Sequence, residues 1–360
     1  MLALLSLLTT ASAQDVCTVG CPHASIQSAI DAVNPGDVGI ITVESRVWDE
    51  NLVVEAGRRI TLLPPLDAAT IASVLLSLTN PKAVEPLGDL APIVITSSQP
   101  LVESVITVRD SSLNLVGVAL DGNLVRALDA NDSDVLFFAS TVFARGLNTE
   151  GGLVRVNGGS FTATVVSFRD GEAGSAGGLV AAYDADVHTE GVSFEDGAGT
   201  FGGCLYVTSG TDRHTVTLNA TVFRGCTSGG IGGALYVRGE LDVTAADLSI
   251  TNSNAIDGGA IAIIGPGPTV VVDQAALSDN TAFGRGGAVF TSDADLTLVG
   301  AGITSNASNY GGGVAQTGDG VVSLQSSIID DNSALYGGGG AYVASGHFEA
   351  IDTLYQRNNV

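Results

Sequence analysis

The segment GGALYVR at residues 232–238 recurs as GGAIAII at residues 258–264 and as GGAVFTS at residues 286–292. The glycine pair also stands at residues 177–178, 202–203, 311–312 and 338–339, with a weaker first copy at 151–152. Successive pairs lie about 25 to 30 residues apart, and self-similarity at such a period is typical of repeat architectures. The repeat therefore decides the fold.

A second landmark, an aromatic or aliphatic residue, precedes each glycine pair by eight or nine residues. The landmarks are Phe143, Phe168, Phe194, Phe223, Ile250, Leu277, Ile303 and Ile329. Between them, apolar and polar residues alternate in short runs such as DLTLV at residues 295–299, which is typical of half-buried strands. Groups rich in Gly, Asp and Pro separate the runs and favour tight turns. Each repeat is therefore predicted to hold about three short strands.

One repeat of this size cannot bury an apolar face alone, but stacked repeats share a continuous core. Equivalent positions then lie above one another at the strand spacing of about 4.8 Å. The predicted fold is all-β, a right-handed parallel β-helix (a β-solenoid). A propeller blade needs about 40 residues, and leucine-rich repeats show a leucine pattern that is missing here.

The part before residue 143 is predicted to start the same solenoid. Residues 25–33 have apolar residues at helical spacing and predict a short helix that covers the open end. Strands are expected at residues 39–43, 51–54, 59–63 and within 93–123. Residues 65–92 hold several prolines and predict an irregular insertion, with a helix possible at 66–78.

Residues 1–13 form an apolar run that ends in Ala11-Ser12-Ala13, which predicts a signal peptide and a secreted or outer cell-surface protein. A buried N-terminal strand or helix is the alternative. The mature part, residues 14–360, is predicted to be one domain with regular repeats over 143–360. Because the last repeat stops at Val360, where another glycine pair is due, the chain looks truncated at its C-terminus.

Composition excludes several classes of protein. Hydrophobic residues make up 45% and charged residues only 14%, which excludes a disordered chain. The net charge of -24 disfavours binding to nucleic acid or to anionic membranes. Outside the leader, no apolar stretch reaches the about 18 residues that a transmembrane helix needs.

Cysteine number and spacing suggest disulfides. An even number of cysteines behind a secretion signal is typical of disulfide bonding. Cys17 and Cys21 are close enough in sequence to bridge locally. The alternative is half of a metal site, for which no matching Cys or His pair follows at ligand spacing. Cys204 and Cys226 either bridge, if their positions adjoin in the solenoid, or remain two separate buried thiols.

Stacking also predicts ladders of identical side chains. Three residues after the landmark come Asn280, Asn306 and Asn332, and Asn358 follows at the same spacing. Stacked amides can hydrogen-bond along the solenoid axis. One residue after the landmark, Arg169, Glu195 and Arg224 form a column of alternating charge suited to cross-strand pairing.

Acidic residues form the next column and are the candidate metal ligands. Two residues after the landmark the chain has Asp170, Asp196, Asp279 and Asp331, with Asp330 adjacent to the last. Oxygen-rich clusters suit calcium, which is therefore the candidate cofactor. The alternative is a solvated acidic face.

Two parts of the sequence resemble known protein families. Residues 25–63, with the sequence ENLVV at 50–54, look like the opening of pectin-lyase-like β-helix proteins. The later repeats resemble those of polymorphic outer-membrane proteins of chlamydiae, which pair Gly-Gly-Ala-aliphatic with Phe-x-x-Asn. Here the first half is kept and the second departs: Phe168, Phe194 and Phe223 are followed by Gly171, Gly197 and Cys226 in place of Asn.

The resemblances imply two functions. One is a non-catalytic structural or adhesin-like protein at the cell surface, with an extracellular polysaccharide or another cell surface as partner. The other is a lyase or hydrolase acting on acidic polysaccharide. The catalytic motifs of such enzymes are missing, so no catalytic residue is assigned. For a lyase, Arg169, Asp170 and Arg224 are the residues to test.

Overall fold

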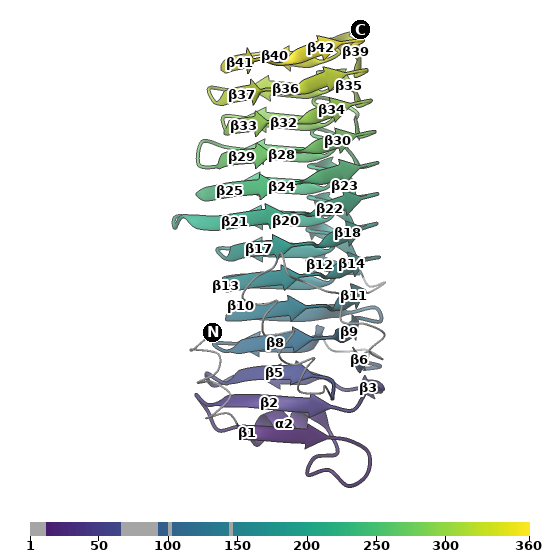
Figure 1. Cartoon of the computed structure of the whole chain (residues 1–360), viewed down its shortest axis with the longest axis vertical. Coiled ribbons are helices and arrows are strands. Elements are labelled where there is room, and N and C mark those ends of the chain that lie inside the picture. Colours follow the sequence, from purple (N-terminus) through teal and green to yellow (C-terminus); the bar gives the residue numbers. More distant parts are fainter. Residues whose placement is uncertain (1–11, 66–92, 100–102, 144–146) are drawn as a thin grey trace.

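The computed structural model describes residues 12–65, 93–99, 103–143 and 147–360. These residues form a parallel β-solenoid of about 12 turns with one short helix near the N-terminus, which confirms the predicted all-β class. The coils stack along one axis from the N-terminal end to the C-terminal end (Figure 1). Each regular coil has four short strands rather than the predicted three, because the largest of the three sheets takes two strands from each coil.

One sheet, here sheet B, takes one strand from each coil. In it Val142, and not Phe143, is in register with Phe168, so the first landmark was assigned one residue too late. The strands of sheet B are β3 (Val47–Asp49), β6 (Ile93–Thr96), β9 (Val118–Asp121), β11 (Thr141–Phe143), β14 (Ser167–Arg169), β18 (Ser193–Glu195), β22 (Val222–Arg224), β26 (Ser249–Thr251), β30 (Ala276–Ser278), β34 (Gly302–Thr304), β38 (Ile328–Asp330) and β42 (Leu354–Gln356).

A second sheet, sheet C, follows sheet B in each coil but exists only from Leu147 onward within the described residues. It immediately precedes the glycine pairs. Its strands are β12 (Leu147–Glu150), β15 (Glu172–Ala176), β19 (Ala198–Phe201), β23 (Thr227–Ile231), β27 (Asn254–Ala255), β31 (Thr281–Ala282), β35 (Ala307–Tyr310) and β39 (Ser333–Gly337).

The largest sheet, sheet A, has two rows, and β10 (Arg126–Phe138) and β13 (Val154–Thr164) run through both. Row 1 follows the glycine pairs in the regular repeats. Its other strands are β4 (Leu52–Val54), β7 (Ser104–Arg109), β16 (Val180–Tyr183), β20 (Leu205–Thr208), β24 (Leu235–Arg238), β28 (Ile261–Ile264), β32 (Val289–Ser292), β36 (Val314–Thr317) and β40 (Ala341–Val343). Row 2 comes next along the coil: β1 (Ser12–Val16), β2 (Val38–Val43), β5 (Arg59–Leu63), β8 (Ser112–Val116), β17 (Asp186–Glu190), β21 (His214–Asn219), β25 (Leu241–Ala246), β29 (Thr269–Asp273), β33 (Asp295–Val299), β37 (Val321–Gln325) and β41 (His347–Ile351).

The glycine pairs form the corner between sheet C and row 1. Gly232 has a φ of +72°, a left-handed conformation that side chains disfavour. A Cβ atom on Gly233 would lie 1.9 Å from the carbonyl oxygen of Gly259 in the next coil. The corner therefore requires both glycines, the first for its backbone angle and the second for close stacking.

The landmark residues stack inside the solenoid. The rings of Phe168 and Phe194 lie 5.2 Å apart, and those of Phe194 and Phe223 lie 4.7 Å apart with nearly parallel planes. All three are fully buried. Burying a large apolar side chain contributes about 1.5–3 kcal/mol, so this column is a main source of stability in the middle coils.

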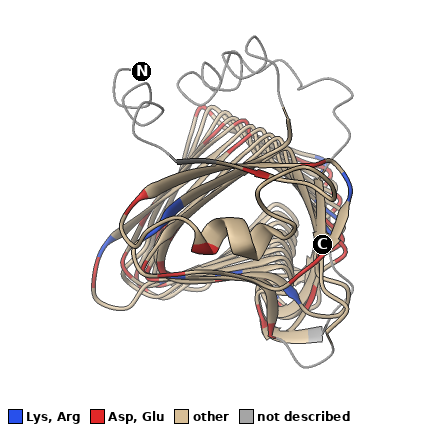
Figure 2. Cartoon of the chain, turned by 90° about the horizontal axis from the view of Figure 1, so that it is seen from below, with Lys and Arg blue, Asp and Glu red and all other residues tan. Residues whose placement is uncertain are grey.

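The helix α2 (Ile26–Asp31) covers the N-terminal end of the core, as predicted, and Figure 2 shows it lying across the open coil. Ser25 caps it, and the Glu50 carboxylate accepts from the backbone N–H groups of Ile26 and Gln27 at 3.0 and 3.1 Å. Ile26 and Ile30 point into the core. The predicted helix at residues 66–78 and most of the insertion at 65–92 lie outside the described residues.

The predicted signal peptide lies largely outside the described residues too. β1 begins at Ser12, so the predicted cleavage site after Ala13 falls within this strand, which pairs with β2. Cleavage there and the single-domain assignment stay predictions. No helix in the described ranges is long and apolar enough to cross a membrane.

Candidate functional site

The predicted charge column lies on sheet B. Arg169, Glu195 and Arg224 are in register on three successive strands, and the Arg224 Nη1 atom lies 3.5 Å from the Glu195 Oε1 atom. Asp170 stands in the turn that follows β14. The two arginines are separated by a whole coil that carries Glu195. The column is thus an exposed charge ladder, and its catalytic role stays untested.

The acidic column has a conformational explanation. Asp170, Asp196, Asp279 and Asp331 all occupy the turn after sheet B, with φ between +55° and +61°. Asp and Asn tolerate this left-handed conformation better than most residues do. In other coils Gly225 and Asn252 occupy the same turn with the same sign of φ. Backbone geometry therefore accounts for these residue types without a metal.

Asp330 differs from that column because it is the last residue of β38 and is buried. It pairs with Arg357, and its Oδ1 atom has no hydrogen-bond partner. Among the residues that the structure describes, no three His, Cys, Asp or Glu side chains gather as metal ligands. Calcium at these positions stays a prediction.

The structure pairs the four cysteines as two disulfides. Cys17 is bonded to Cys21, with a Cα–Cα distance of 5.6 Å, and Cys204 to Cys226, with 5.5 Å. Cys204 and Cys226 are fully buried. Their bond joins the corner before β20 to the turn after β22, across the inner side of sheet C.

The four ladder asparagines are brought together inside the turn between sheets B and C. The backbone N–H groups of Asn280, Asn306 and Asn332 donate to the Oδ1 atom of the next asparagine at 2.9, 2.9 and 3.0 Å. The side-chain amides donate along the same column. Asn280, Asn306 and Asn332 are buried, so the ladder is structural and presents nothing to a ligand.

The most distinctive polar cluster lies elsewhere, on the side of row 1 that faces away from the apolar core; it is partly buried, and the sequence predicted no site there. Asp129, Arg155, Ala181, Tyr206 and Tyr236 are in register on five successive strands. Each of the last four stands three residues after the second glycine of its pair. We call these positions, together with Arg126, Glu150 and Tyr183, the row 1 site.

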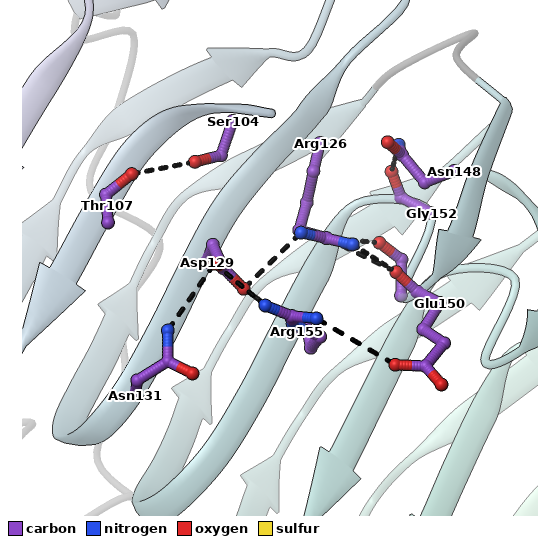
Figure 3. Close-up of polar contacts among 10 residues, drawn as sticks. Ser104, Thr107, Arg126, Asp129, Asn131, Asn148, Glu150, Gly152 and Arg155 are labelled. Carbon is purple, nitrogen blue, oxygen red and sulfur yellow. Dashed lines mark hydrogen bonds and ion pairs between the residues drawn. The ribbon is translucent and has the colours of Figure 1, made fainter. Parts of the chain in front are cut away.

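One end of the row 1 site is a network of charges (Figure 3). The Arg155 guanidinium donates to both carboxylate oxygens of Asp129, at 2.7 and 3.0 Å. The Arg126 Nη1 atom lies 3.4 Å from Asp129 Oδ1, and the Arg155 Nη1 atom lies 3.9 Å from Glu150 Oε2. The hydrogen bond to Asp129 raises the pKa of Arg155, whereas burial lowers the pKa of Arg126. Both arginines remain charged at neutral pH.

Arg126 has a second set of contacts that explains why an arginine stands there. The register of Leu128 with Val154 places it one coil before Gly152, at the position that glycine takes in higher coils. In those coils, backbone N–H groups of one corner donate to the carbonyls of the next, as from Gly177 to Phe201. Within the described residues, sheet C begins one coil above Arg126. The Arg126 guanidinium donates to the carbonyls of Glu150 and Gly151 at 2.8 and 3.2 Å, which are the equivalents of the carbonyls that a backbone N–H group binds in higher coils.

The other end of the row 1 site is a row of tyrosines. The rings of Tyr183 and Tyr206 lie 5.4 Å apart, and those of Tyr206 and Tyr236 lie 5.0 Å apart in a parallel stack. Burial is the main cause that raises the pKa of all three phenols, and Glu150 adds to it for Tyr183. The phenols are therefore neutral at physiological pH, able to donate and accept hydrogen bonds beside a flat apolar face.

Geometry limits the chemistry that the row 1 site can perform. Asp129 is buried and already forms ion pairs with two arginines, so it is a poor general base. The side chains of Arg155 and Glu150 are 28% and 36% exposed and can meet a ligand. The site thus offers a partly exposed cation and carboxylate beside the half-buried rings of Tyr183 and Tyr206, whereas Tyr236 is buried. Asp129 and Arg155 stand one repeat apart, a spacing that relates the two positions in the sequence but does not show which way their side chains point.

No protein-family model and no curated protein matches this chain. Among solved structures, the chain resembles the A-module of the mannuronan C-5 epimerase AlgE4 from Azotobacter vinelandii, with a TM-score of 0.51, 12% identity and coverage of 92% of this chain and 90% of that chain. It also resembles ORF18 of Geobacillus virus E2, with a TM-score of 0.47, 12% identity and coverage of 98% and 63%. The likeness to the epimerase module shows the fold alone, a parallel β-helix. The resemblance to chlamydial repeats stays a prediction.

Proposed function

We propose that the protein is an extracellular, polysaccharide-binding β-solenoid, and that the row 1 site holds the sugar chain. The observation that carries the proposal is the line of Tyr183, Tyr206 and Tyr236 beside Arg155. The half-buried rings of Tyr183 and Tyr206 offer apolar ring edges and phenol hydroxyl groups, which suit contact with a sugar chain. The arginine offers a planar set of donors for a carboxylate on the chain.

The extracellular setting rests on two features. The disulfides Cys17–Cys21 and Cys204–Cys226 are typical of proteins from oxidising compartments. The N-terminal apolar run is typical of a secretion signal. An adhesive role at a cell surface follows naturally, because a rigid solenoid presents its binding row at a fixed place along its length.

The test is binding of the full chain to alginate, pectin and neutral glycans, measured by titration calorimetry. Tyr206→Leu should weaken binding by about tenfold, a loss of about 1.4 kcal/mol. Tyr355→Leu, the same change on sheet B, is the matched control and should bind as wild type. Equal binding by both variants would rule out the row 1 site.

A second candidate is an enzyme that acts on acidic polysaccharide. Arg155 could neutralise a sugar carboxylate while Tyr183, whose pKa is raised, carries a proton beside it. The solenoid likeness to a mannuronan C-5 epimerase favours mannuronan as the first substrate to test. Solvent hydrogen exchange into mannuronan, followed by NMR, should then disappear in Tyr183→Phe. Loss in Arg169→Ala instead would assign the reaction to sheet B.

A further inference from the structure

The outer face of sheet C carries a second unusual surface, formed by β23, β27, β31, β35 and β39. The register aligns Thr227, Asn254, Thr281, Ala307 and Ser333 in one column. The positions two residues further along the chain hold Gly229, Ile256, Phe283, Asn309 and Leu335, and they lie where sheet C has register shifts and where the short strands β27 and β31 have ended. Hydroxyl and amide groups thus stand beside apolar side chains on most of these coils.

The apolar members of this surface are exposed between the middle coils and the C-terminal end of the solenoid. Phe283 is 73% exposed, Leu335 63% and Ile256 49%. Tyr310 packs its ring against Tyr336 at 5.5 Å, which fixes one edge of the surface. Ile256 and Phe283 lie on neighbouring coils and Leu335 lies two coils beyond Phe283; such a group of exposed large apolar side chains marks an interaction surface rather than chance exposure.

Charge limits what can occupy this face. The whole chain has 38 acidic and 14 basic residues, yet these five strands and the residues that directly follow them carry only Asp257 and Arg285. Those two pair with each other at 2.9 Å, and the guanidinium of Arg285 also lies over the Phe290 ring. The face is therefore neutral on an otherwise acidic molecule, which favours an uncharged occupant.

Size limits the occupant further. Four steps of about 4.8 Å make the surface roughly 19 Å long, and its strands span only a few residues of about 3.3 Å each. Such a strip is well below the about 800 Å² per partner that a stable protein interface buries. A narrow strip that sets apolar groups beside polar ones along the coils fits a linear polymer instead.

We infer that this face of sheet C binds a linear neutral polysaccharide, as a surface separate from the row 1 site. The flat faces of the sugar rings would lie on Ile256, Phe283 and Leu335, and their hydroxyls would meet the hydroxyl and amide groups of the neighbouring column. The coil repeat matches an extended polymer because both present equivalent groups at regular spacing. This inference does not depend on the proposed function.

The test is depletion of the full chain from solution by microcrystalline cellulose and by chitin. Wild type should bind at least one of them, and Phe283→Ser should bind about tenfold more weakly. Val271→Ser on β29, an exposed apolar position on another sheet, is the matched control and should bind as wild type. Because Phe283 is largely exposed, its replacement should leave the melting temperature unchanged.

Three results would overturn the inference: no binding to either neutral glycan, equal binding by Phe283→Ser, or a wild-type dimer by sedimentation that Phe283→Ser converts to a monomer. The third would assign the face to self-association. Tyr206→Leu separates the two surfaces, since it should weaken binding at the row 1 site and leave cellulose or chitin binding intact.

Discussion

At the scale of the residue, Asn306 shows how a single side chain connects neighbouring coils. Its Oδ1 atom accepts from the backbone and side-chain amides of Asn280, while its Nδ2 atom donates to the Leu277 carbonyl. Its own N–H group donates to Asn332. Each of these groups is buried, so the bonds replace water that cannot reach them.

Replacing Asn306 with alanine should therefore be costly. The change leaves the buried N–H group of Asn280 without an acceptor, and we expect the free energy of unfolding to fall by about 3 kcal/mol. Denaturant titration followed by circular dichroism measures it. Asn309→Ala, a change of the same kind on the outer face of sheet C, should cost less than about 0.5 kcal/mol. Equal costs would contradict the ladder.

Asp279 tests whether the acidic column serves the backbone or a metal. Its φ of +58° predicts that Asp279→Val costs about 1–2 kcal/mol and that Asp279→Gly costs little. Ser278→Val, on the neighbouring strand position, should be nearly neutral. Thermal melts in calcium and in chelator complete the test: a calcium-dependent rise that Asp279→Gly abolishes would favour the metal.

At the scale of the element, sheet C depends on how it begins. Its first strand, β12, has no strand of its own sheet below it in the described residues. The carbonyls of Glu150 and Gly151 face that coil, and the guanidinium of Arg126 satisfies them. Arg126 thus performs with a side chain what the backbone of each corner does in higher coils.

Arg126→Met should remove that cap and leave Asp129 with one arginine. Since a buried charge loses a partner, we expect a loss of about 3 kcal/mol and faster hydrogen exchange at the amides of Gly151 and Gly152. Arg155→Met is the control that also removes a partner of Asp129 but leaves both carbonyls bonded. Unchanged exchange in Arg126→Met would show that the corner closes without it.

The tyrosine row predicts a response to alkaline pH. Burial raises the pKa of Tyr206 and Tyr236 above that of an ordinary tyrosine, about 10. Their contribution to stability is thus complete below pH about 10 and is lost as pH rises through the higher folded-state values. Melting temperature should fall less steeply above pH 10 in the double variant Tyr206→Phe/Tyr236→Phe. Tyrosinate absorbance in wild type should appear together with unfolding.

At the scale of the whole molecule, the contacts between stacked coils oppose the repulsion between like charges. The continuous core and the hydrogen bonds between coils hold together a chain with a net charge of -24. In a solenoid each coil contacts only its neighbours, so repulsion between like charges on successive coils acts along the whole length. Arginines such as Arg213, which pairs with Glu240 and Asp242, relieve it only locally.

Salt should therefore stabilise the protein. Raising the ionic strength from about 0.01 M to about 1 M shortens the screening length from about 30 Å to about 3 Å. We expect the melting temperature to rise by several degrees over this range in sodium chloride. The Asn306→Ala variant should show the same slope, because its defect is not electrostatic. A flat or falling curve would show that repulsion does not limit stability.

The fold class and much of its detail are predictable from the order of the amino acids alone. The glycine pairs repeat at the coil period because each coil needs the same corner, and the asparagine column keeps that period because the amides bond along the axis. The capping helix was also predictable, since Ser25 and the apolar spacing of Ile26 and Ile30 are local signals. The first landmark was predicted at Phe143 but lies at Val142, because two apolar residues stand side by side in the sequence and the sequence alone does not show which one points inward.

The location of the candidate functional surfaces, in contrast, follows only from the folded chain. Asp129, Arg155 and Tyr206 are far apart in sequence and become one line only when the register of each strand is fixed. The neutral face of sheet C is equally invisible in the sequence, because exposure depends on which way a side chain points. The period of the sequence specifies which residues stack on one another in successive coils. The bend of the backbone at each corner decides which side chains are exposed to solvent.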